Sequence, residues 1–90
     1  MGDSGSPILT KVVLDVLKPH KPSILELGEV LGSVDGVKTV NIVIREVDVE
    51  TETIKVVLEG SGFKYKEIRD VMEKFGAKIH SVDEVVVEKR

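Results

Sequence analysis

Cysteine is absent from this 90-residue chain, which excludes disulfide bonds, a thiolate nucleophile and cysteine-ligated zinc. Aromatic residues make up only 3% of the sequence, as Phe63, Tyr65 and Phe75. None of them falls in a predicted strand, where an RNA-recognition sheet carries the side chains on which bases stack. With a net charge of −3, the chain also lacks the basic stripe that neutralises phosphates. We therefore expect no nucleic-acid partner.

Long apolar runs are missing too, so the sequence predicts a soluble protein with no membrane partner. The chain has no glutamine and a single asparagine, Asn41, and this depletion of thermolabile side chains is typical of thermophilic proteins. Residues 1–7 show no targeting pattern. We interpret them as a flexible segment before a single domain over residues 8–90, in a cytoplasmic protein.

The spacing of the apolar residues predicts six elements in one order. Apolar and polar residues alternate in four predicted strands, and they follow a helical period in two predicted helices. The strands cover 8–17, 37–50, 54–59 and 77–87, and the helices cover 24–34 and 68–75. Ser23 and Glu26 form a capping box before the first helix, and Gly76 ends the second. The alternation changes parity at Arg45 and Glu46, which predicts a bulge.

Strand, helix, strand, strand, helix, strand with right-handed crossovers predicts the α+β fold called ferredoxin-like. Its antiparallel sheet has the strand order 4-1-3-2 and carries both helices on one face. The fourth strand is an edge and contains the apolar run 85–87. An open apolar edge invites pairing, so we expect this strand to contact another subunit.

The same topology gathers polar residues at one rim, where the first strand ends and the hairpin of strands two and three turns. The candidate binding residues there are Asp15, Lys18, His20, His80 and Asp83. Asp15 lies in a central strand, where a charge needs a partner. It either pairs with Lys55 or Lys11 or contacts a ligand. The two histidines form either a metal or proton-switching pair or a structural contact.

Four carboxylates alternate along the hairpin and could converge on a hard cation, which prefers oxygen ligands. They are Glu46, Asp48, Glu50 and Glu52, and Ca²⁺ or Mg²⁺ is the cofactor they would hold. The alternative is a solvated hairpin face without an ion, and the spacing matches no EF-hand loop. Neither Ser23 nor Ser81 has a histidine and acid arranged as a triad, so we assign no catalytic residue.

Four segments together carry a resemblance to a known family. They read LDVLKPH at 14–20, EVDVETE at 46–52, EG at 59–60 and IHSVDEV at 79–85. Across residues 8–85 the chain resembles an archaeal family of short uncharacterised proteins, the domain of unknown function "two-eleven". The resemblance implies a ferredoxin-like fold, an archaeal cytoplasmic setting and a higher, ring-like homo-oligomer. It implies no reaction. Lys21 and the charged tail 88–90 depart from the family pattern, so the charge of the rim is not carried over.

These observations favour a protein without catalytic activity that assembles with itself and acts as a ligand-binding or regulatory module. The alternative is a divalent-cation-binding protein, or a cation-dependent enzyme, that uses the acidic hairpin.

Overall fold

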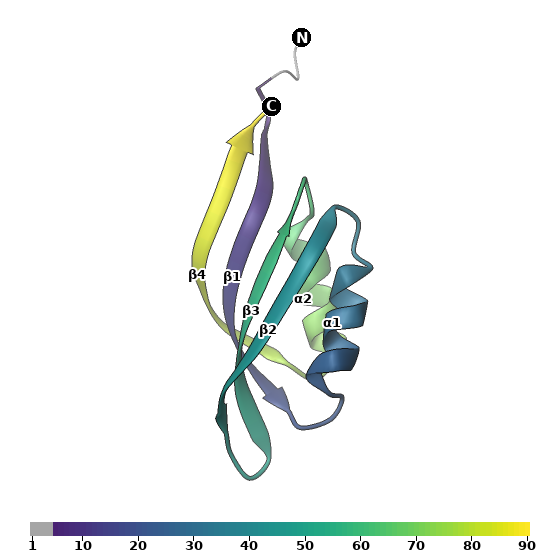
Figure 1. The fold of residues 1–90 in the computed structure, drawn as a ribbon, viewed down its shortest axis with the longest axis vertical. Helices are drawn as coiled ribbons and strands as arrows, with labels where there is room; N and C mark the ends of the chain where they lie inside the picture. The colour runs from purple at the N-terminus through teal and green to yellow at the C-terminus, as the bar shows by residue number, and fades with distance from the viewer. Residues whose placement is uncertain (1–4) are drawn as a thin grey trace.

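The computed structural model describes residues 5–90 and shows one antiparallel sheet with two helices on one face (Figure 1). The elements are β1 (Pro7–Pro19), α1 (Ile24–Gly32), β2 (Val37–Val47), β3 (Thr51–Gly60), α2 (Tyr65–Lys74) and β4 (Lys78–Lys89). The strands lie in the order β2-β3-β1-β4, which confirms the predicted ferredoxin-like topology. Of the predicted flexible segment, residues 1–4 lie outside the described residues, and Pro7 is already part of β1.

Local signals in the sequence place the element boundaries. Before α1, the Ser23 hydroxyl accepts from the Glu26 amide at 3.2 Å while the Glu26 carboxylate accepts from the Ser23 amide at 3.0 Å, which confirms the capping box. Gly76 follows α2 with φ +68°, a left-handed conformation that glycine adopts without strain. The register of β2 against β3 shifts between Ile44 and Glu46, which confirms the bulge.

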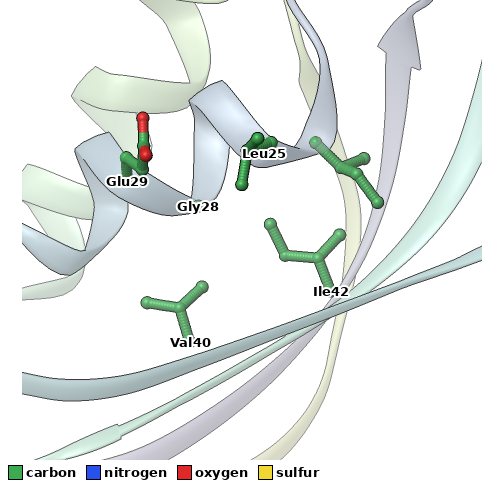
Figure 2. Close-up of a pocket in the computed structure, with 6 residues that line it drawn as sticks. Leu25, Gly28, Glu29, Val40 and Ile42 are labelled. Carbon is green, nitrogen blue, oxygen red and sulfur yellow. The ribbon is translucent and has the colours of Figure 1, made fainter.

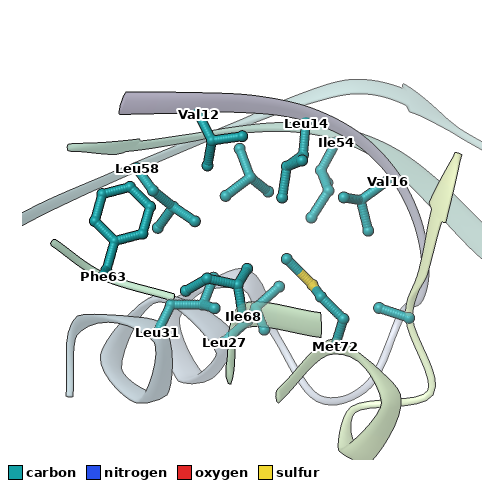
Figure 3. Close-up of a cluster of buried hydrophobic side chains, with 12 residues drawn as sticks. Val12, Leu14, Val16, Leu27, Leu31, Ile54, Leu58, Phe63, Ile68 and Met72 are labelled. Atoms are coloured by element: carbon teal, nitrogen blue, oxygen red, sulfur yellow. The ribbon is translucent and has the colours of Figure 1, made fainter. Parts of the chain in front are cut away.

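The core lies between the sheet and the helices (Figure 3). Every second residue of β1 and β3 points into it, and α1 and α2 each contribute two fully buried side chains. The buried apolar residues are Val12, Leu14, Val16, Leu27, Leu31, Ile54, Val56, Leu58, Phe63, Ile68, Met72 and Ala77. Neither helix is long and apolar enough to cross a membrane, as judged over residues 5–90.

Candidate functional site

A buried polar network of Lys18, His20 and Glu52 closes one end of the domain. Lys18 is the last inward-facing residue of β1, and its side chain is fully buried. Its ammonium group donates to the carbonyl of Pro19 at 2.7 Å and also to the carbonyl of Pro22. Glu52 Oε1 lies 3.8 Å away, so the burial of each charge is compensated by the other.

His20 joins this network to the turn between β2 and β3. Its Nδ1 lies 3.2 Å from Glu52 Oε1, and its Nε2 lies 2.7 Å from the Asp48 carbonyl and 3.1 Å from the Val49 carbonyl. Both ring nitrogens therefore face acceptors, and only the imidazolium form can donate to both sides. The hydrogen bond with Glu52, followed by that with the Asp48 carbonyl, raises the pKa of His20 above its usual 6.5.

On the opposite face of the sheet, an open-face pocket of about 410 Å³ collects a different set of charges. It is lined by Asp15, Arg45, Glu46, Thr53 and Asp83. In β4, Asp83 is an extra residue between the partners of Val13 and Leu14, so it has no partner in β1. His80 is likewise an extra residue between the partners of Asp15 and Val16. A smaller hollow beside the pocket is lined by His80 together with Asp15 and Glu46. Bulges in β4 and β2 thus bring these polar side chains to one place.

Asp15 has the neighbour that the sequence predicts but not the ion pair. The register places Lys55 directly opposite Asp15, as expected for adjacent central strands. No ion pair within 4.0 Å joins them, and among the described residues Lys11 instead pairs with Glu84 at 3.4 Å. Asp15 remains partly exposed to water in the open-face pocket, which reduces its need for a partner.

The structure divides the predicted rim residues between the two faces of the sheet. Glu52 belongs to the buried polar network with Lys18 and His20, whereas Glu46 lines the open-face pocket. Asp48 contributes a backbone carbonyl to His20, and the side chains of Asp48 and Glu50 are exposed. Across residues 5–90, no group of three or more His, Asp or Glu side chains is placed to hold a metal ion. Cation binding by the hairpin stays a prediction.

An uncovered valine row lies on β4, at one edge of the sheet. Val82, Val85 and Val87 are 44%, 52% and 54% exposed. They pair with Leu14, Val12 and Leu9, which belong to the core side, so the row lies on the same face as the helices. Together β1 and β4 extend past the helices, which leaves the C-terminal part of β4 without a cover (Figure 1).

The opposite edge of the sheet carries an apolar groove between α1 and β2. Its volume is about 420 Å³, and it is lined by Ile24, Leu25, Gly28, Glu29, Val40 and Ile42. Val40 and Ile42 point from β2 toward α1, and Gly28 leaves the helix wall without a side chain (Figure 2). Leu25 is 70% exposed at its mouth. The groove was not predicted from the sequence, although Leu25 is an apolar residue outside the helical stripe and could have indicated it.

Comparison with known proteins identifies a family and a related archaeal protein. The model of the DUF211 family, described as "Uncharacterized ArCR", matches residues 10–90. The chain belongs to this family. It is also 43% identical over 82 residues to the uncharacterized protein MJ0319 of Methanocaldococcus jannaschii, a match that covers 91% of this chain and 84% of that protein. The predicted archaeal family is thereby confirmed, and it is a family without an assigned reaction.

Proposed function

We propose that this DUF211 protein is a non-catalytic module whose copies assemble through the β4 edge. The observation that carries the proposal is the uncovered valine row of Val82, Val85 and Val87. Burial of apolar surface stabilises by about 25 cal/mol per Å², so three half-exposed valines on a free strand edge favour association. The outward N–H and C=O groups of an edge strand add backbone hydrogen bonds to a partner strand.

The chemistry of the polar residues agrees with a role in assembly rather than catalysis. In the buried polar network, Lys18 and His20 already satisfy Glu52, and none of the described buried side-chain N or O atoms lacks a hydrogen-bond partner. Neither Ser23 nor Ser81 has a histidine as hydrogen-bond partner: the hydroxyls contact Glu26 and Asp83. The hydroxyls of Ser23 and Ser81 and the ring of His20 are therefore engaged in structural contacts.

Light scattering of the unmodified protein and of two matched variants tests the proposal. Val85→Glu places a charge in the middle of the valine row, and we expect it to reduce the particle to the 9.9 kDa of one chain. Val86→Glu makes the same change on the other face, beside Lys11, and should leave the oligomer intact. A monomeric unmodified protein at micromolar concentration, or equal behaviour of the two variants, would contradict the proposal.

Divalent-cation binding is the second candidate function, and the open-face pocket is the observation that favours it. Asp15, Glu46 and Asp83 line its wall, and carboxylate oxygens are the ligands of Ca²⁺ and Mg²⁺, although the three side chains are not placed together to hold an ion in the structure. An ion that binds only the folded state stabilises it by RT ln(1 + [L]/Kd). Millimolar Ca²⁺ should then raise the melting temperature of the unmodified protein but not of Asp15→Asn. Unchanged melting and a flat titration calorimetry trace would exclude the site.

A further inference from the structure

We infer that the valine row of one copy occupies the groove between α1 and β2 of the next copy, so that β4 adds to the free edge of β2. This inference rests on the proposed assembly through β4 and names the surface that receives it. The occupant of the groove is thus a second copy of this chain. The contact is heterologous, since two different surfaces of the same chain meet.

The directions of the strands allow this pairing with the helices of both copies on the same face. Successive neighbours in the order β2-β3-β1-β4 are antiparallel, so β2 and β4 at the two edges run in opposite directions. Two copies side by side, with their helices on the same face, therefore bring β4 and β2 together as an antiparallel pair. Such an addition continues the hydrogen-bonding pattern of the sheet across the contact.

The register places the two apolar surfaces at the same level along the strands. One row across the sheet runs Val40, Leu58, Val12 and Val85, and another runs Ile42, Val56, Leu14 and Val82. Val87 lies farther along β4, whereas Val85 and Val82 are level with Val40 and Ile42, the two β2 residues that line the groove. In a neighbouring copy set beside the first without a shift, they would lie next to those residues and beneath α1.

The charged residues of β4 lie outside this contact. Lys89 stands opposite Pro7, four residues beyond Val85, whereas Val40 lies beside Gly32 at the end of α1, so the register places Lys89 past the helix. Glu84 and Glu88 alternate onto the other face of the sheet. The surface of β4 beneath α1 is therefore apolar.

A symmetric contact between two β4 strands would cover fewer of the exposed apolar residues. It would pair the free edges of β4, but it would leave the groove and Leu25 open on both copies. It would also place no helix over the valines, because α1 lies over β2 at the other edge of the sheet. The heterologous contact covers both apolar surfaces with one interface.

Mixing two one-sided variants tests the inference. Leu25→Glu changes the mouth of the groove and keeps the valine row, whereas Val85→Glu changes the row and keeps the groove. Each variant alone should be monomeric in native mass spectrometry. An equimolar mixture should give a particle of one chain of each kind, because one intact groove can still receive one intact row. Val30→Glu, an equally drastic change on α1 outside the groove, should assemble like the unmodified protein.

Each outcome decides between the two proposals. If the unmodified protein is monomeric, the assembly through β4 and the groove inference both fail. If Val85→Glu is monomeric but Leu25→Glu assembles fully, copies join through β4 alone and only the groove inference is overturned. Gly28→Glu provides a second groove variant, since a Cβ at Gly28 meets Ile42 at an ordinary 3.6 Å and the helix accepts a side chain there. Absence of the mixed particle with both groove variants would overturn the inference.

Discussion

The buried polar network and the valine row of β4 differ in whether contacts within one chain satisfy them. Lys18, His20 and Glu52 satisfy one another and the carbonyls around them within a single copy. Val82, Val85 and Val87 are half-exposed at the β4 edge of the sheet, and no contact within residues 5–90 of their own chain covers them fully. The polar groups at one end of this domain are satisfied by contacts within the chain, whereas its apolar edge is uncovered, which is why we propose that this edge associates.

This contrast predicts different consequences when each region is changed. Damage to the buried polar network should lower the stability of every single copy, whatever its state of assembly. Damage to the valine row should alter the size of the particle and leave the isolated domain folded. The predictions below test the first half of this contrast, from the largest expected effect to the smallest.

The largest effect is expected for Lys18→Met. The change removes the cation that balances Glu52 and leaves the carbonyls of Pro19 and Pro22 without their buried donor. Loss of one partner from a buried ion pair costs about 3 to 5 kcal/mol of unfolding free energy. Denaturant titration measures it, and Lys21→Met, an exposed lysine three residues away, should cost less than about 0.5 kcal/mol. Equal losses in the two variants would show that the network does not stabilise the fold.

A smaller effect is expected from the protonation of His20. Its pKa is raised in the folded state, so its contribution to stability is complete below the unfolded pKa of 6.5 and is lost as the pH rises through the higher folded pKa. Protonation of His20 should therefore make the denaturant midpoint of the protein higher at pH 5.5 than at pH 8. His20→Gln should lose that difference, and His80→Gln should keep it. A pH dependence that follows His80 instead would contradict the assignment.

The smallest effect is expected for Asp15→Asn. Lys55 stands opposite Asp15 but forms no ion pair with it, and Asp15 is partly exposed where it lines the open-face pocket. We expect the unfolding free energy to change by less than about 0.5 kcal/mol, as for most changes at partly exposed sites. A loss of several kcal/mol would mean that the carboxylate is held by Lys55 in solution and belongs to the structural residues.

Sequence reasoning reached the fold because its signals are local and agree with one another. The capping box at Ser23, the glycine at 76 and the change of parity at Arg45 each act within a few residues, and each was confirmed. Periodicity then fixed which face of each strand is buried. The exposed edge of β4 also followed from a local pattern, the run of valines at 85–87.

The polar site was predicted less well, because its geometry depends on which face each carboxylate reaches. Four alternating acids from Glu46 to Glu52 looked equivalent in the sequence, but the bulge at Arg45 separates Glu46 from Glu52. The two bulges that make Asp83 and His80 additional residues in β4 depend on pairing with β1, far away in the chain. Leu25 indicates an exposed apolar surface on α1, but the groove itself depends on the distance between α1 and β2, which is not encoded locally.

Hydrogen exchange along β4 tests the central claim, assembly through this edge, most directly. Within residues 5–90 of one chain, β4 pairs only with β1, so its outward amides are free to exchange unless another strand covers them. In peptides spanning residues 82–89, we expect slow exchange in the unmodified protein and in Val86→Glu. We expect faster exchange in Val85→Glu and in the unmodified protein after dilution to a monomer. Exchange that is equal in all of these samples would contradict assembly through β4.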